Sequence, residues 1–135
     1  MEKIGIVTVT YNSTAVLSPF LECIWKQSHQ NFVLYIIDNA STDSTLQILE
    51  KKQDSRLKII KNKSNFGVAK ANNQGIKKAI EDGCNQVLII NNDVEFETTL
   101  IEKLIKVQIQ KNCSLVTPKM MFYDNKNLIW YAGSW

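Results

Sequence analysis

The sequence has few of the residues that stabilise small domains through disulfide bonds or zinc sites. Among its 135 residues are three cysteines, Cys23, Cys84 and Cys113, which are far apart and form no Cys-x-x-Cys pair, and a single histidine, His29. Isolated thiols in an odd number argue against a disulfide framework, and one histidine is too few to complete a typical zinc site. We therefore expect the cysteines to pack as small apolar residues in a reduced, cytoplasmic protein.

Long apolar runs and a strong charge bias are also missing. No stretch of about eighteen apolar residues occurs, and the first residues lead directly into a strand pattern without the apolar region of a signal peptide. Neither a membrane span nor export is therefore expected. The 16 basic and 13 acidic residues give a net charge of +3, which is too balanced to predict a nucleic-acid partner.

Three phosphate-handling signatures do not occur either. The first predicted strand is not followed by Gly-x-Gly-x-x-Gly, as in dinucleotide oxidoreductases, and the chain has no Gly-x-x-x-x-Gly-Lys-Ser/Thr loop. A phosphoacceptor receiver needs an acidic pair after its first strand and an aspartate after its third. The corresponding positions are Tyr11-Asn12 and Asn62-Lys63, so the sequence excludes this class as well.

Short apolar runs alternate with helical patterns along the whole chain. With 44% apolar residues the chain can bury a core, and we expect one domain over residues 1–135. The alternation predicts an α/β fold, with a Rossmann-like, mostly parallel sheet and helices on both faces. The expected strands span 4–10, 32–37, 57–60 and 87–90, and another begins at 115–117. The expected helices follow Asn12 or Ser13, run from a capping cluster at 41–44 to about 51, and span 68–81 and 98–111.

The predicted third helix has a small inner face. Its members are Ala69, Asn72, Gly75, Ile76 and Ala79. A glycine in the middle of a helix costs about 1 kcal/mol relative to alanine. Gly75 therefore indicates close packing of this helix on the sheet.

Polar loops follow four of the predicted strands. In an open parallel sheet, ligands bind beyond the carboxyl ends of the strands, because loops and helix amino termini converge there. The loops that this rule nominates span 10–12, 38–40, 62–67 and 91–93. All four are rich in hydrogen-bonding side chains, as a nucleotide site requires.

The Asn91-Asn92-Asp93 turn is the candidate metal site. A carboxylate flanked by amides directly after a buried strand offers the oxygen donors that Mg²⁺ or Mn²⁺ prefers, with water and phosphate oxygens completing the shell. The alternative is a structural Asx turn before the next helix.

Asp38 and Tyr11 are candidates for contact with a nucleoside. The Asp38 carboxylate ends the most apolar strand, where it could accept a hydrogen bond from a pyrimidine N–H or a ribose hydroxyl. Capping of the helix start at 41–44 is a compatible second role for it. Tyr11 is placed either to lie against a base or to pack at the rim of the sheet.

The third loop adds candidates for the diphosphate. The Asn65-Phe66-Gly67 turn leads into the third helix, and Gly67 suits a turn that needs a positive φ. Seven cations and no acid lie between residues 56 and 78. They predict either attraction of a diphosphate, with Lys70 as a direct contact, or an ordinary solvated face.

Four ordered motifs together resemble the family 2 glycosyltransferases. They are Val7-Thr8-Val9-Thr10-Tyr11-Asn12, Asp38-Asn39-Ala40-Ser41-Thr42-Asp43, Asn65-Phe66-Gly67 and Asn91-Asn92-Asp93. The later segments Thr117-Pro118-Lys119 and Trp130-Tyr131-Ala132-Gly133 are similar to the rhamnosyltransferase-like branch of this family. The resemblance covers nearly the whole chain.

The resemblance implies an A-type glycosyltransferase fold and an inverting transfer from a UDP- or dTDP-sugar held with Mn²⁺ or Mg²⁺. Asp38 would contact the pyrimidine, and 10–12 would line its pocket. Asp93 would match the metal-binding acid of the Asp-x-Asp motif. Asn91 replaces the first acid and could still bind a ribose hydroxyl. The remaining nucleotide-binding candidates by position are Asn65, Gly67, Lys70 and Asn92.

The resemblance covers only the nucleotide-binding, amino-terminal half of such an enzyme. The general base of the family lies well past the metal motif, so we expect it beyond Trp135, and we interpret Asp124 as structural. The acceptor would be a glycan or a lipid-linked saccharide, reached at the inner face of the membrane. The rival hypothesis is a truncated, non-catalytic nucleotide-binding module.

The tail from 119 to 135 is rich in aromatic residues and lacks helical period. This pattern predicts either paired strands or a segment that faces a partner. A partner-facing segment would make the tail a contact for homo-oligomerisation.

Overall fold

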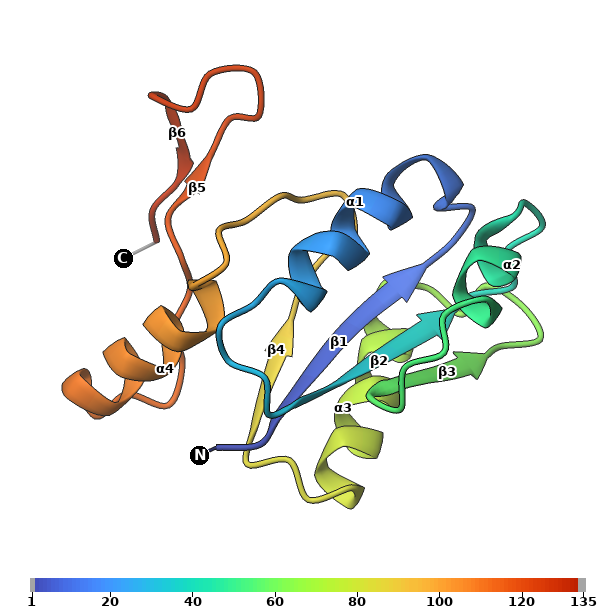
Figure 1. Cartoon of the computed structure of the whole chain (residues 1–135), viewed down its shortest axis with the longest axis horizontal. Helices are drawn as coiled ribbons and strands as arrows, with labels where there is room; N and C mark the ends of the chain where they lie inside the picture. Colours follow the sequence, from blue (N-terminus) through green and yellow to red (C-terminus); the bar gives the residue numbers. More distant parts are fainter. Residues whose placement is uncertain (1, 134–135) are drawn as a thin grey trace.

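Alternating strands and helices build a parallel sheet covered on both faces, which confirms the predicted fold class (Figure 1). The computed structural model describes residues 2–133. The strands are β1 (Ile4–Thr10), β2 (Phe32–Asp38), β3 (Leu57–Lys61), β4 (Gln86–Ile89), β5 (Met120–Met121) and β6 (Ile129–Tyr131). The helices are α1 (Thr14–Trp25), α2 (Thr45–Glu50), α3 (Val68–Glu81) and α4 (Leu100–Lys111).

The main sheet has the strand order β3-β2-β1-β4, and all its neighbouring strands are parallel. Alternate residues along each strand point to opposite faces. Ile6 and Ile36 pack with α1, α2 and α4 on one face, whereas Val7 and Ile37 pack with α3 on the other. Because the strands are parallel, the loops after β1, β2, β3 and β4 all leave from the same edge of the sheet.

Helix α3 packs closely on the sheet through Ala71, Gly75 and Ala79, which are buried and four residues apart. The prediction of Ala69 on this face was wrong, because Ala69 is exposed. Residues 69 and 71 are separated by about 200° around the helix axis, so they cannot share one face. A Cβ atom on Gly75 would lie 2.4 Å from Val7 Cγ1, which explains the glycine.

Gly75→Ala is expected to destabilise the protein. The added methyl would also lie 2.6 Å from Ile37 Cδ1, and such overpacking costs about 1–3 kcal/mol, more than the roughly 1 kcal/mol gained in helix propensity. We expect the free energy of unfolding in urea to fall by about 1–2 kcal/mol. Asn73→Ala, on the exposed face of the same helix, is the matched control and should not destabilise. A Gly75→Ala protein as stable as the parent would contradict the close packing.

The prediction of a strand beginning at 115–117 was wrong. This segment is irregular, and Leu115 is 88% exposed. Leu115 and Val116 line a groove of about 300 Å³ together with β4 and α4. A strand forms only where its backbone groups pair with a neighbour, and this segment lies across the groove from the outer edge of β4 without pairing to it.

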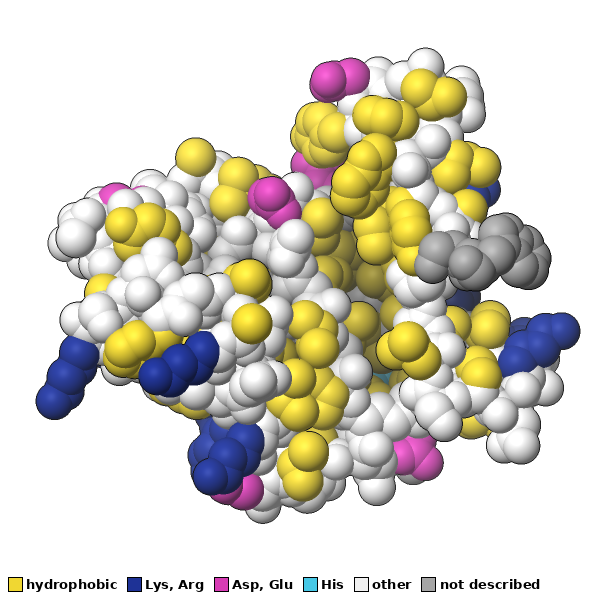
Figure 2. Space-filling model, turned by 180° about the vertical axis from the view of Figure 1, so that it is seen from behind, with side chains coloured by type: hydrophobic (Ala, Val, Ile, Leu, Met, Phe, Trp, Pro, Cys, Tyr) yellow, Lys and Arg dark blue, Asp and Glu magenta, His cyan; other side chains and the backbone are white. Residues whose placement is uncertain are grey.

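The predicted pairing of strands in the tail is confirmed by the antiparallel β5–β6 hairpin, which projects from the body of the molecule (Figure 1). Hydrophobic side chains gather on the hairpin and in the hollow beside it (Figure 2), and Tyr123, Leu128 and Trp130 are all more than half exposed. Trp135, the last aromatic residue of the tail, lies outside the described residues. Within residues 2–133, no helix is long and apolar enough to cross a bilayer.

Candidate functional site

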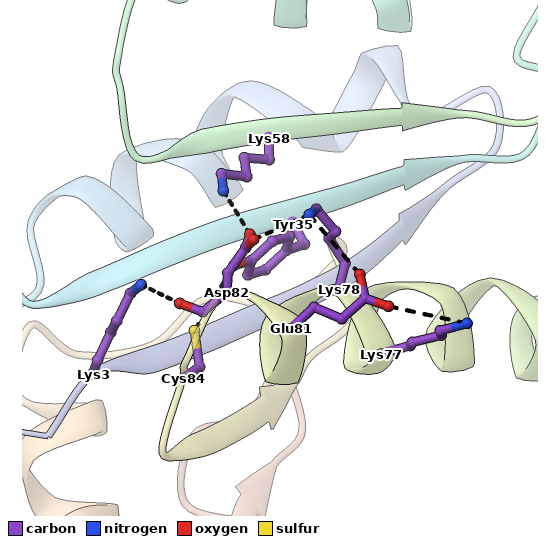
Figure 3. A network of polar contacts seen from close by, with 8 residues as sticks. All are labelled: Lys3, Tyr35, Lys58, Lys77, Lys78, Glu81, Asp82 and Cys84. Atoms are coloured by element: carbon purple, nitrogen blue, oxygen red, sulfur yellow. Dashed lines mark hydrogen bonds and ion pairs between the residues drawn. The ribbon is translucent and has the colours of Figure 1, made fainter.

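Two polar clusters lie at opposite ends of the sheet. In the cluster around Asp82, the charged and polar groups find their partners within the protein (Figure 3). The Asp82 carboxylate accepts hydrogen bonds from Lys58 Nζ at 2.5 Å, Lys78 Nζ at 3.0 Å and Tyr35 Oη at 2.8 Å. Lys3 Nζ donates to the Asp82 carbonyl oxygen at 2.6 Å. These contacts join β2, β3, α3 and the residue that precedes β1, so the cluster around Asp82 has a structural role.

The surroundings of this cluster shift the pKa of both acids in it. Burial and the hydrogen bonds to Asp82 and Cys84 raise the pKa of Tyr35 far above its usual value. Hydrogen bonds from Lys58, Lys78 and Tyr35 hold the pKa of Asp82 well below its usual value. The folded protein therefore favours a neutral Tyr35 beside an ionised Asp82.

Asp82→Asn is expected to lower the thermal midpoint by several degrees at pH 7. A carboxyl group whose pKa is depressed in the folded state stabilises fully above its unfolded pKa of about 3.9. This contribution is lost as the pH falls through the folded pKa. The difference in thermal midpoint between parent and variant should therefore shrink between pH 5 and pH 2. Asp124→Asn, an exposed control, should give no such pH-dependent difference, and a constant difference for Asp82→Asn would contradict the assignment.

The second polar cluster forms an open cleft of about 350 Å³ at the carboxyl edge of the sheet. The predicted site residues that line it are Tyr11, Asn65, Gly67, Asn91, Asn92 and Asp93. The structure thus brings together residues from the loops after β1, β3 and β4, as the rule for open sheets predicts. Five further residues line it: Val9, Ser13, Asn39, Val68 and Asn72.

Thr10 and Asp38 are fully buried at this edge and do not line the cleft. One carboxylate oxygen of Asp38 accepts from Thr10 Oγ1 at 2.8 Å and from Ser41 Oγ at 2.5 Å, and the other accepts from Ser41 N at 2.9 Å. The Thr10 contact follows from the strand register, which pairs Thr10 with Asp38. Asp38 therefore anchors the turn before α2 through Ser41, and it does not cap the helix itself, whose N-cap residue is Ser44.

Asn12 lies outside the cleft lining and ties two loops together. It adopts a positive φ of 51°, which asparagine tolerates, and its Oδ1 accepts from Thr42 N at 2.8 Å. Asp43 accepts from Thr14 Oγ1 at 2.6 Å and from Thr45 N at 2.9 Å. Partial burial raises the pKa of Asp43, but the hydrogen bonds from Thr14 and Thr45 outweigh it and hold that pKa well below its usual value. These contacts fix the loop after β1 against the loop after β2.

Lys70 also lies outside the cleft lining, with its Nζ 4.0 Å from the centre of the Phe66 ring. It belongs to the run of seven cations between residues 56 and 78. The five that form ion pairs are Arg56, Lys58, Lys61, Lys77 and Lys78. In the part of the chain that the structure describes, Lys63 and Lys70 form none, so most of this run already has an acidic partner within the protein.

The Asn92 side chain makes hydrogen bonds within the protein, whereas the side chains of Asn91 and Asp93 are available to a ligand. The Asn92 Nδ2 donates to the Val9 carbonyl oxygen at 2.9 Å and to Ser13 Oγ at 3.1 Å. The side chains of Asn91 and Asp93 make no hydrogen bond or ion pair within residues 2–133. Asp93 is the one carboxylate among the described residues that line the cleft.

No group of three or more histidine, cysteine or acidic side chains suited to a metal occurs in residues 2–133. A cation at Asp93 would therefore depend on ligand and water oxygens for most of its shell. Mg²⁺ and Mn²⁺ sites that bind a substrate diphosphate have this character. The donor set at Asp93 and Asn91 fits such an open site.

Sequence reasoning missed cleft residues that contribute through tertiary structure. Ser13 was considered only at the start of the first helix, and Asn39, although part of the nominated loop 38–40, was given no role of its own. Val68 and Asn72 occupy the same side of α3, four residues apart, where the helix begins. That spacing was a usable signal, since the start of this helix was predicted correctly.

A parallel α/β sheet with a polar cleft at its carboxyl edge places the protein in the class of nucleotide-binding α/β folds. Within that class, residues 5–135 match the model of the family described as "Glycosyl transferase family 2". The chain belongs to this family, which confirms the resemblance at the family level.

Two curated relatives illustrate the match. The chain is 28% identical over 128 residues to "Glycosyltransferase GlyG" of Streptococcus pneumoniae, covering 93% of this chain and 42% of that protein. It is 35% identical over 79 residues to the Escherichia coli protein named "UDP-Glc:alpha-D-GlcNAc-diphosphoundecaprenol beta-1,3-glucosyltransferase WfaP", covering 58% of this chain and 32% of that protein. The chain thus spans less than half the length of these relatives, as expected for one half of such an enzyme.

Solved structures support the fold. TarS 1–349 of S. aureus in complex with UDP-GlcNAc superposes with a TM-score of 0.71 at 23% identity, covering 90% of this chain and 38% of that one. The mannosyltransferase PcManGT of Pyrobaculum calidifontis, in complex with GDP-Man and Mn²⁺, gives 0.71 at 21% identity, covering 78% of this chain and 32% of that one. At these identities the likeness is one of fold, and it confirms the A-type glycosyltransferase fold.

Proposed function

We propose that this chain holds the sugar-nucleotide donor of an inverting glycosyltransferase, a UDP- or dTDP-sugar, together with Mn²⁺ or Mg²⁺. The observation that carries the proposal is the placement of Asp93, a single unpaired carboxylate in an amide-rich cleft. The PcManGT complex, which contains GDP-Man and Mn²⁺ on the same fold, supports a cation at such a site.

Residues on each side of the cleft have a role in the proposed binding of the donor. Tyr11, 53% exposed, lies against the base, and Asn91 binds a ribose hydroxyl. Asp93 binds the cation, with the neutral Asn91 as a weaker second donor. The first turn of α3, from Gly67, has no side-chain cap, so its free backbone N–H groups favour an anionic group nearby.

The role of Asp38 in binding is indirect. Because Thr10 and Ser41 enclose its carboxylate, Asp38 orients the turn after β2 and the end of β1. A direct contact between Asp38 and a pyrimidine, as the resemblance implies, requires its hydrogen bonds from Ser41 to be exchanged for hydrogen bonds from the ligand.

The transfer step needs charge stabilisation and a base. A bound cation would supply positive charge against the departing nucleoside diphosphate. This chain's own groups bind and orient the donor so that the anomeric carbon is open to attack by an acceptor hydroxyl from the opposite side. Asp124 lies in the exposed turn of the hairpin and does not line the cleft, so it is not assigned as the base that takes the proton from this hydroxyl.

The acceptor is proposed to be a glycan or a lipid-linked saccharide at the cytoplasmic face of the membrane. The diphosphoundecaprenol named as part of the WfaP substrate is a lipid carrier, which supports this class. The sugar transferred is proposed to be a hexosyl or a deoxyhexosyl group, the latter as in the rhamnosyltransferase-like branch. The exposed aromatic side chains of the hairpin support self-association of the chain through this segment.

Calorimetric titration with UDP and dTDP, with and without Mn²⁺, tests donor binding. We expect binding that Mn²⁺ strengthens, and in Asp93→Ala the affinity in Mn²⁺ should fall at least tenfold, to the metal-free value, because a charge-assisted contact is lost. Asp124→Ala is the control with the same change outside the cleft, and it should bind as the parent does.

The outcomes separate the two functional hypotheses. If neither nucleotide binds in either condition, the donor site is refuted. An unchanged response to Mn²⁺ in Asp93→Ala would refute only the metal assignment. Nucleotide binding by a full-length protein that performs neither transfer nor donor hydrolysis would favour the non-catalytic module.

A further inference from the structure

A chain of three side-chain amides runs beneath the α3 wall of the cleft. Asn39 Nδ2 donates to the Gly67 carbonyl oxygen at 3.3 Å, and Asn39 Oδ1 accepts from Asn62 Nδ2 at 2.8 Å. Asn62 and Gln74 form a reciprocal pair, with each amide nitrogen 2.9 Å from the other's oxygen. The chain therefore links β2, the end of β3 and α3 to the backbone where α3 begins.

The backbone fixes the orientation of every amide in this chain. A carbonyl oxygen only accepts hydrogen bonds, so the Asn39 atom beside the Gly67 oxygen must be the nitrogen. The Asn39 oxygen must then face Asn62, which in turn must present its own nitrogen. Asn39 is 2% exposed, and burial makes a reversed amide costly because it would leave polar atoms unsatisfied.

Asn39 is also a lining residue of the cleft, so its orientation matters for a ligand. Its oxygen is engaged by Asn62, and its nitrogen carries two hydrogens, of which the Gly67 oxygen takes one. The group of the Asn39 side chain that remains for a ligand is therefore the second N–H, a hydrogen-bond donor. Asn62 and Gln74 do not line the cleft and act only through Asn39.

We propose that Asn39 determines specificity in the cleft: held by Asn62 and Gln74, it offers a ligand an N–H donor and selects a hydrogen-bond acceptor there. This inference rests on the proposed donor site. A pyrimidine carbonyl oxygen and a phosphate oxygen share the required chemistry. Asn62 and Gln74 are positioning residues, since neither would touch the ligand.

Asn62→Asp is the sharpest variant, because it keeps the size of the side chain and removes its donors. The new carboxylate would attract the Asn39 nitrogen, and the reversed amide would turn the Asn39 oxygen toward the Gly67 oxygen. We expect the affinity for UDP to fall about tenfold, the equivalent of one lost hydrogen bond, while the ratio of affinities with and without Mn²⁺ stays unchanged. Asn73→Asp makes the same chemical change on the exposed face of α3, and it should bind within twofold of the parent.

Parallel titrations with uridine and with pyrophosphate in Mn²⁺ locate the acceptor on the ligand. A loss for uridine assigns it to the nucleoside, and a loss confined to pyrophosphate assigns it to a phosphate. If folded Asn62→Asp protein binds UDP as tightly as the parent, the inference is overturned. Failure of the parent itself to bind any nucleotide would instead refute the proposed function.

A measurement on the parent protein keeps the orientation testable if the variant does not fold. In ¹⁵N-labelled protein, the Asn39 side-chain NH₂ should show contacts to the protons of Gly67 and Val68. Contacts that instead place the Asn39 oxygen beside Gly67 would overturn the proposal without any ligand.

Discussion

A buried carboxylate at the end of β2 is the constraint on which the carboxyl edge of the sheet depends. A charge inside a protein is tolerated only where hydrogen bonds replace its hydration. Asp38 obtains them from Thr10 on the neighbouring strand and from the backbone and hydroxyl of Ser41. To bring Ser41 back onto Asp38, the chain takes a turn in which Ala40 has a φ of 63°, which costs an alanine about 1–2 kcal/mol. The local strain is therefore tied to the anchoring of the loop.

The two ends of the sheet differ in whether their acidic side chains have partners within the protein. At the amino end, three lysines and a tyrosine surround Asp82, so its charge serves the fold (Figure 3). At the carboxyl end, amides and hydroxyls hold one another in place, and they leave Asp93 and Asn91 without partners in the described residues. The unpaired Asp93 carboxylate beside an ordered cleft is the observation on which the proposed donor site rests.

The elements that were predictable are those with a strong local pattern. The alternation of strands with amphipathic helices predicts the fold class, and the rule for open sheets places Tyr11, Gly67 and Asp93 at one edge of the sheet. Ala69 was assigned to the wrong face because sequence spacing alone did not fix the rotation of α3. The segment 115–117 has a strand-like composition, but composition cannot supply a paired neighbour.

Roles that depend on tertiary hydrogen bonds could not be predicted from the sequence. Asn12 and Lys70 belong to the predicted site by position, yet one binds a neighbouring loop and the other lies on Phe66. The amides of Asn39, Asn62 and Gln74 are 12 to 35 residues apart in the chain, and no local period connects them. Their contacts arise only when β2, β3 and α3 have assembled.

We propose that a divalent cation and a pyrimidine nucleotide meet at Asp93, in the cleft at the carboxyl edge of the sheet. Paramagnetic broadening by Mn²⁺ tests it most directly, in ¹⁵N-labelled protein saturated with UDP. We expect selective loss of backbone signals at 91–93 first, followed by those of Tyr11, Ser13 and Gly67. Broadening centred on Asp82 or Asp124, or spread evenly over the acidic surface, would contradict it.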